Sequence, residues 1–148
     1  MIGSLYSSDL SDTYYMTSEP WYDRIQNMGV TYHIKVVSSI QVNNGYNLPT
    51  INRLVDTKEE RNTIIEGMYE GFLESIKENM LEYGHVLKSL NDNESLNFII
   101  NLTECDGCDM PKEIELSVPM SVILEYHNGA IFDIEAMDKI QLKVLEKN

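Results

Sequence analysis

The sequence has few basic residues, and their scarcity excludes two classes of partner. Lysine and arginine together number 11 against 24 aspartates and glutamates, a formal net charge of −13 over 148 residues. Direct nucleic-acid binding needs a basic footprint on the protein, and an anionic membrane surface attracts the same kind of patch. We therefore expect neither of these partners. An acidic protein of this size attracts basic proteins or cations instead.

Long apolar runs are also missing. No stretch approaches the roughly 20 apolar residues of a membrane-spanning helix, and residues 1–12 lack the basic and apolar regions of a signal peptide. The sequence thus predicts a soluble protein without membrane insertion, cytoplasmic unless a signal peptide has been removed from it. The length suits one domain. We expect residues 1–18 to be a flexible or loosely docked arm and residues 19–148 to form a single domain.

The sequence has none of the short motifs that mark common catalytic sites. It has no P-loop, no glycine pattern for dinucleotide binding and no His-Glu-x-x-His pair. The histidines, His33, His85 and His127, are scattered, and none has a partner at a spacing that predicts a catalytic triad. No catalytic or cofactor-binding residue is predicted. This favours a non-enzymatic role, although catalytic groups can also assemble from distant positions.

Cysteine is limited to Cys105 and Cys108, spaced as Cys-Asp-Gly-Cys. A redox dithiol usually places its first cysteine at a helix N-terminus, whereas here Asp106 and Asp109 add negative charge, which disfavours a thiolate. Zinc needs four ligands, so a zinc site at Cys105 and Cys108 would take further ligands from histidines or a second subunit. The plainer interpretation is two thiols, or one disulfide, at a hairpin tip. Zinc binding and thiol redox chemistry are the alternatives.

A long amphipathic helix is predicted between Asp56 and about Leu90. Thr57 suits the N-cap position, with Glu60 as the other half of a capping box. At about 100° per residue, a broad apolar stripe faces a core. It comprises Ile65, Met68, Tyr69, Phe72, Ile76, Met80, Tyr83 and Leu87. Gly84 is expected either to cap the helix or to mark a kink before its last turn.

The other side of this helix is acidic and includes two glycines. Glutamates recur every four residues, and each like-charged pair at that spacing costs about 0.2–0.5 kcal/mol. Each mid-helix glycine costs about 0.8–1.0 kcal/mol relative to alanine, so we expect another backbone to approach closely. It belongs to the same chain or, alternatively, to a second copy in a homodimer. The remaining alternative is that the spacing of the glycines is accidental. The candidate partner surface comprises Glu66, Gly67, Glu70, Gly71, Glu74, Glu78 and Glu82. It is either a solvated face or a docking surface for a basic protein or a loosely held cation.

The segments before and after the helix are mostly predicted to be strands. Residues 19–28 have helical spacing and predict a short helix, in which Trp21 is expected to pack within the protein. Alternation over residues 29–42 predicts a strand with a bulge near residues 37–39. Residues 96–103 and 113–118 predict a hairpin around the cysteines, with one polar face exposed to solvent.

The C-terminal third predicts two short helices and a last strand. One helix runs from Pro119 to Asn128 and is ended by Gly129, and another turn runs from Asp133, as its cap, to Lys139. A strand over residues 140–144 follows. The whole order predicts an α+β fold, with a mostly antiparallel sheet of about four strands, one long amphipathic helix across one face, and short C-terminal helices.

Three functions agree with these features. The first is a non-enzymatic module that binds a protein or another ligand through the acidic helix or the exposed sheet face, for example an inhibitor that imitates nucleic acid. The second is a metal-binding or thiol-redox protein centred on Cys105 and Cys108. The third is a structural accessory subunit of a larger assembly.

Overall fold

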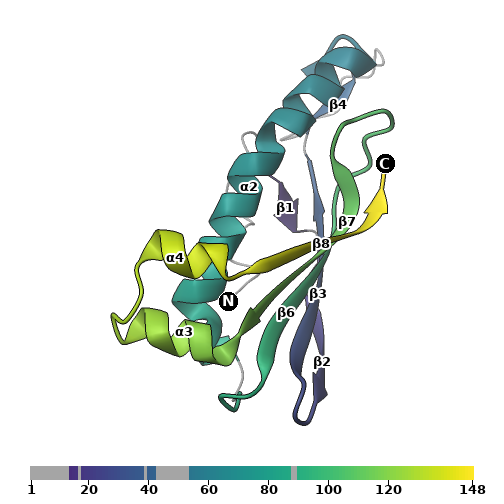
Figure 1. Ribbon diagram of the computed structural model, residues 1–148. Coiled ribbons are helices and arrows are strands. Elements are labelled where there is room, and N and C mark those ends of the chain that lie inside the picture. Colours follow the sequence, from purple (N-terminus) through teal and green to yellow (C-terminus); the bar gives the residue numbers. More distant parts are fainter. Residues whose placement is uncertain (1–13, 17, 39, 43–53, 88–89) are drawn as a thin grey trace.

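The computed structural model describes residues 14–16, 18–38, 40–42, 54–87 and 90–148 (Figure 1). The elements in chain order are β1 (Tyr15–Met16), β2 (Trp21–Ile25), β3 (Gly29–Val37), β4 (Gln41–Val42), β5 (Leu54–Val55), α2 (Lys58–Leu87), β6 (Ser95–Asn101), β7 (Pro111–Pro119), α3 (Met120–His127), α4 (Asp133–Asp138) and β8 (Gln141–Lys147). None of the described helices has the length and apolar character that crossing a membrane requires.

Six strands form one mixed sheet. Its order is β1-β3-β6-β7-β8, and β2 also pairs with β3. The central pair, β3 and β6, is parallel, with Gly29 opposite Ser95 and Lys35 opposite Asn101, and the other pairs are antiparallel. The parallel pair follows from the connection, because strands joined through a helical crossover re-enter the sheet in the same direction. The α+β class and the mostly antiparallel sheet are confirmed, while the expected count of about four strands is corrected to six, with one parallel pair at the centre.

The core lies between one face of the sheet and α2 (Figure 1). Alternate residues of β3, β6 and β7 are buried on this face, as the period of two in a strand requires. From the helix, Ile65, Phe72, Ile76 and Met80 of the predicted stripe are buried against them, whereas Tyr83 is 36% exposed. The stripe is therefore confirmed over most of its length.

The start of α2 is close to the predicted capping box. The Glu60 backbone N–H donates to Thr57 Oγ1 at 3.1 Å. The Glu60 carboxylate accepts from the backbone N–H of Asp56 at 3.3 Å, one residue before the position that a standard box uses. The glutamate therefore satisfies a free donor at the helix entrance, as expected, with a shift of one residue.

Gly84 neither caps nor ends α2, so the interpretation of this residue as a helix cap was wrong. The residue is buried inside the helix, which continues to Leu87. A Cβ at this position would lie 2.8 Å from Ile123 Cδ1 and 3.2 Å from Leu96 Cδ2. The missing side chain therefore lets α2 approach α3 and β6 closely.

Residues 21–25 form strand β2, and the predicted helix over residues 19–28 is wrong. The strand pairs with β3 through a turn in which Asn27 has a φ of 68°, and Gly29, the first residue of β3, has a φ of 133°. Every residue of β2 is exposed. The hydrophobic spacing that suggested a helix therefore does not describe a buried face, and pairing with β3 determines the conformation instead.

The part of the N-terminal arm that the structure describes is docked. Tyr14 is fully buried, and its hydroxyl donates to the Ile65 carbonyl oxygen at 2.6 Å. Tyr15 and Met16 pair with the end of β3. Beyond β3, the strand predicted over residues 29–42 is divided, because β3 ends at Val37 and β4 belongs to a separate pair with β5. The predicted bulge includes residue 39, which lies outside the described chain.

The C-terminal third largely follows the prediction. β6 and β7 form the expected hairpin. Helix α3 ends with Gly129 at a φ of 77°, and the N–H groups of Gly129 and Ala130 donate to the carbonyl oxygens of Tyr126 and Glu125. This is a Schellman ending. Helix α4 differs in its start, since Phe132 is the N-cap and Asp133 is the first helical residue.

Candidate functional site

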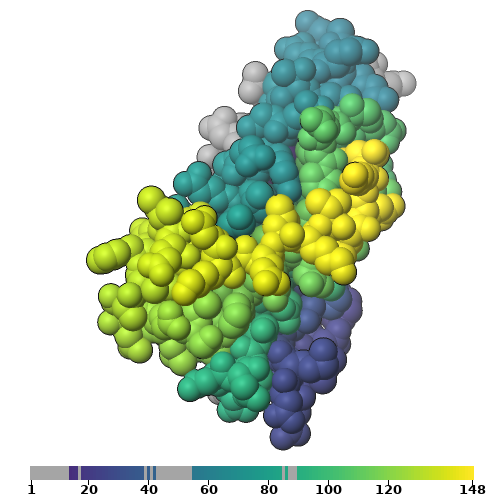
Figure 2. Space-filling view, viewed as in Figure 1, coloured from purple at the N-terminus to yellow at the C-terminus, as the bar shows by residue number. Residues whose placement is uncertain are grey.

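The acidic side of α2 is open to solvent. Gly67, Glu70, Gly71, Glu74, Glu78 and Glu82, which we call the outer face of α2, are all exposed. The sheet and the core lie on the opposite side of the helix (Figure 1). The candidate partner surface is thus brought together on one continuous side of one helix, with Glu66 as the exception. The teal helix is also seen in the space-filling view (Figure 2).

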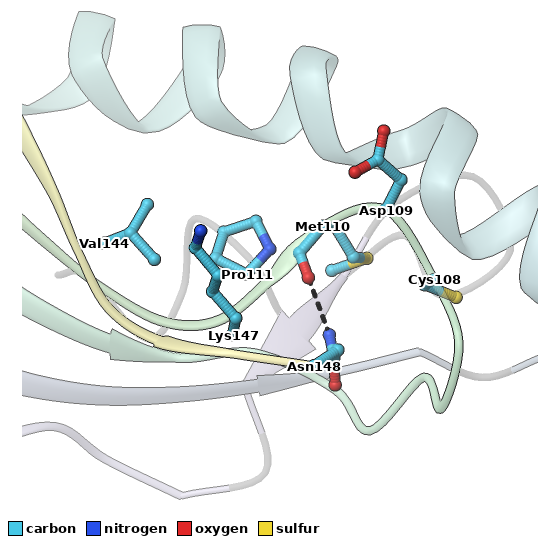
Figure 3. Close-up of a pocket in the computed structure, with 7 residues that line it drawn as sticks. All are labelled: Cys108, Asp109, Met110, Pro111, Val144, Lys147 and Asn148. Atoms are coloured by element: carbon cyan, nitrogen blue, oxygen red, sulfur yellow. Dashed lines mark hydrogen bonds between the residues drawn. The ribbon is translucent and has the colours of Figure 1, made fainter.

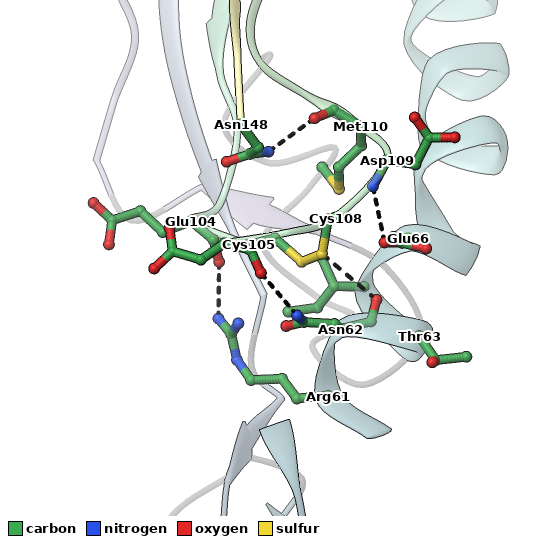
Figure 4. Close-up of a disulfide and its surroundings, with 12 residues drawn as sticks. Arg61, Asn62, Thr63, Glu66, Glu104, Cys105, Cys108, Asp109, Met110 and Asn148 are labelled. Atoms are coloured by element: carbon green, nitrogen blue, oxygen red, sulfur yellow. Dashed lines mark hydrogen bonds between the residues drawn. A yellow bond between two sulfur atoms is a disulfide. The ribbon is translucent and has the colours of Figure 1, made fainter. Parts of the chain in front are cut away.

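Glu66 is used within the chain. Its side chain is half-buried, and Oε1 accepts from the backbone N–H of Asp109 at 2.9 Å (Figure 4). The residue therefore holds the loop between β6 and β7, and it does not belong to the outer face. Spacing alone could not separate it from the other glutamates, because they share the same four-residue period.

We expected another part of the same chain to pack closely against Gly67 and Gly71. For the described residues, this prediction is wrong. No described atom lies within 4 Å of the position that a Cβ would take at Gly67 or at Gly71. Both positions are exposed, so the local cost of about 0.8–1.0 kcal/mol for each glycine relative to alanine is not offset by packing against the described chain. Gly84 has the role that was expected of these two residues.

A pocket of about 380 Å³ lies at the C-terminal end of the outer face. It is formed by α2, α3 and α4, and its lining includes Glu78, Glu82, Tyr126 and Asp133. The Tyr126 hydroxyl donates to Glu82 Oε2 at 3.1 Å. Burial, followed by the effects of Glu82 and Asp133, raises the pKa of Tyr126 to about 12. The described lining combines the aromatic rings of Tyr83 and Tyr126 with three carboxylates.

The Cys105–Cys108 loop lies against the first turns of α2 (Figure 4). The two cysteines form a disulfide in this structure. Arg61 Nη2 donates to the Glu104 carbonyl oxygen at 3.1 Å, and Asn62 Nδ2 donates to the Asp106 carbonyl oxygen at 3.0 Å. With the bond from Asp109 to Glu66, three consecutive parts of the loop are held by one helix. The predicted hairpin-tip position of the cysteines is confirmed, and the loop is packed down rather than projecting.

The environment of the cysteines is enclosed. Cys105 is fully buried and Cys108 is 7% exposed. A shallow pocket of about 230 Å³ beside Cys108 is lined further by Met110, Pro111, Val144 and Asn148 (Figure 3). Among the described residues, no three His, Cys, Asp or Glu side chains gather to hold a metal ion. His33 and His127, two of the candidate further ligands, contact other groups, Asp23 and the Leu81 carbonyl oxygen.

Trp21 is on the open face of the sheet, contrary to the expectation that it packs within the protein. It is 59% exposed and stacks on His33, with ring centroids 3.7 Å apart. His33 Nε2 lies 3.2 Å from Asp23 Oδ2. The predicted solvated face of the hairpin therefore continues into β2 and β3, because residues that alternate with the core face are half-buried or exposed there.

Sequence reasoning missed a buried carboxylate at Glu94. This residue is fully buried, and it pairs with Arg24 through two hydrogen bonds of 2.6 and 2.8 Å. Its oxygens also accept from the backbone N–H groups of Asn27 at 3.0 Å and Asn91 at 2.8 Å. The Arg24 hydrogen bond first, and the Asn91 backbone bond next, lower the pKa of Glu94 to about 2. No local pattern signals a pair separated by 70 residues.

Comparison of the chain with protein-family models, with curated proteins and with solved structures found no match. The function of this chain is therefore inferred from its own geometry.

Proposed function

We propose that this protein is a non-enzymatic interaction module that binds a basic partner protein through the outer face of α2. The observation that carries the proposal is the pair of exposed glycines inside a row of exposed glutamates. At Gly67 and Gly71, the space that a side chain would occupy has no described atom within 4 Å. A helix surface without side chains lets a partner backbone approach closely, and the flanking carboxylates favour a partner with positive charge.

The pocket at the end of the outer face fits this kind of partner. Its carboxylates, from Glu78, Glu82 and Asp133, suit the charge of a lysine or arginine side chain, and its volume of about 380 Å³ accommodates one. The ring of Tyr126 adds a surface on which a cation binds favourably. A basic anchor residue of the partner would enter this pocket while the partner backbone lies along Gly67 and Gly71.

The proposal is tested by comparing how tightly two variants of equal net charge bind the partner protein. The ridge variant carries Glu70→Gln, Glu74→Gln and Glu78→Gln, and the control variant carries Glu19→Gln, Asp92→Asn and Glu135→Gln. All six residues are exposed, and each variant changes the net charge from −13 to −10. Affinity capture from the native lysate identifies a partner, whose affinity is then measured by calorimetry with each purified variant.

We expect the ridge variant to weaken binding at least tenfold and the control variant to change it little. A double variant, Gly67→Ala with Gly71→Ala, should also weaken binding, because two methyl groups would separate the backbones. Equal losses in the ridge and control variants would show that binding responds only to net charge, and the proposed surface would then be wrong. Recovery of no partner by the unchanged protein would also contradict the proposal.

A further inference from the structure

A third pocket, of about 370 Å³, collects basic residues in this acidic protein. It lies where the ends of β3 and β6 meet the start of α2 and of β7. Lys35, Arg61 and Lys112 all line it. Three of the 11 basic residues of the chain therefore surround one cavity. This pocket is distinct from the outer face of α2, and its charge has the opposite sign.

Arg61 is held in place by the backbone. Its Nε donates to the Ile40 carbonyl oxygen at 3.2 Å. Its Nη2 donates to the Glu104 carbonyl oxygen at 3.1 Å, as Figure 4 shows. Neither bond uses Nη1, and within the described part of the chain this nitrogen is therefore available to a ligand. A guanidinium fixed in this way has lost its side-chain freedom before a ligand arrives, which lowers the entropic cost of binding.

The remaining lining completes a site for a small anion. The two lysines are exposed or half-buried, so their ammonium groups reach solvent and an incoming ligand. Asn101 adds a polar side chain, and Val37 and Leu102 add an apolar wall. Glu104 also lines the pocket, and Glu146 lies 3.8 Å from Lys112 Nζ. Among the described lining residues, three cations outnumber one carboxylate.

The geometry points to a binding site for a small oxyanion, a phosphate or carboxylate group carried on a compact molecule, at Lys35, Arg61 and Lys112. The volume lies within the range of about 300–1,000 Å³ that is common for small-molecule sites. The net negative charge of the protein does not prevent binding at physiological salt. Beyond a Debye length of about 8 Å the distant carboxylates of α2 are largely screened, so the local cations dominate.

The test is a calorimetric and NMR titration of the full chain with two probes, inorganic phosphate and succinate, at constant ionic strength. We expect saturable binding of at least one probe. The tighter probe tells whether the site prefers a phosphate or a dicarboxylate. Lys35→Gln and Lys112→Gln should each weaken binding about tenfold, since each removes one charged hydrogen-bond donor to the anion.

The matched control is Lys77→Gln, which removes the same charge from α2 at a residue that does not line the pocket. It should leave the affinity unchanged. Thermal melting verifies that each variant is folded, and the exposure of Lys35 makes unfolding of that variant unexpected. The inference is overturned if neither probe saturates, or if Lys77→Gln weakens binding as much as Lys35→Gln does.

Discussion

At the residue scale, Glu94 joins two turns that are distant in the sequence. Its carboxylate binds Arg24 of β2, and it also accepts from the backbone at Asn27 and at Asn91. The turn between β2 and β3 is thereby tied to the turn that leads into β6. A buried carboxylate with these partners stabilises the fold only while it is ionised, so its effect depends on pH.

We predict that Glu94 makes the protein sensitive to acid. Its pKa of about 2 in the folded protein is lower than the value of about 4.3 for a free glutamate. The stabilisation is therefore fully present above about pH 5 and is lost as the pH falls toward 2. Urea unfolding between pH 2 and 7 measures this, with Glu94→Gln as the comparison. The variant should be less stable at pH 7 and should lose less stability on acidification. Parallel pH profiles for the two proteins would contradict the assignment.

At the element scale, the three glycines of α2 have different surroundings although they look alike in the sequence. Gly84 lies under Ile123 and Leu96, whereas Gly67 and Gly71 are exposed. We predict that Gly84→Leu destabilises the protein by about 1–3 kcal/mol, the usual cost of overpacking. Gly71→Ala should instead stabilise it by about 0.8–1.0 kcal/mol through helix propensity.

Chemical denaturation of these two variants beside the unchanged protein measures both effects. For a chain of this size, 1 kcal/mol corresponds to a change in melting temperature of roughly 2–4 °C. If Gly71→Ala lowers the free energy of unfolding, the exposed position packs against part of the chain. A neutral Gly84→Leu would mean that α3 moves aside without cost.

The same helix shows what sequence reasoning could and could not give. The hydrophobic period placed Ile65, Phe72 and Met80 in the core, because burial on one side of a helix leaves a local trace in the sequence. The role of Gly84 left no such trace, since its neighbours come from α3 and β6. Glu66 was likewise grouped with the other glutamates by its spacing, because its contact with the loop between β6 and β7 leaves no local trace. The conformation of β2 also could not be predicted, because it depends on pairing with β3.

The candidate sites also differ in whether they could be predicted from the sequence. Most of the outer face of α2 was predicted, because the exposure of Glu70, Glu74 and Glu78 follows from one helical period. The pocket at the end of the outer face and the pocket lined by basic residues were not predicted. Each one collects residues from several elements, such as Tyr126 and Asp133 near α2, or Lys35 and Lys112 near Arg61. Only the packing of the whole chain brings such residues together.

At the scale of the whole molecule, the net charge of −13 opposes the compact state. Part of this repulsion is concentrated on α2, where four like-charged pairs at a spacing of four residues, from Glu66 to Glu82, together cost roughly 1–2 kcal/mol. Salt weakens these interactions, because the Debye length falls from about 30 Å at 0.01 M to about 3 Å at 1 M. We therefore predict that sodium chloride raises the melting temperature of the protein over this range.

The two charge variants separate the local part of this effect from the global part. At low salt, the ridge variant (Glu70→Gln, Glu74→Gln, Glu78→Gln) should be about 1–2 kcal/mol more stable than the unchanged protein, since it removes all four pairs. The control variant has the same net charge and keeps the pairs, so it should gain less. At 1 M salt the three proteins should melt at similar temperatures. If the two variants gain equally at low salt, the repulsion belongs to the molecule as a whole. The outer face of α2 would then carry no local strain for a basic partner to relieve.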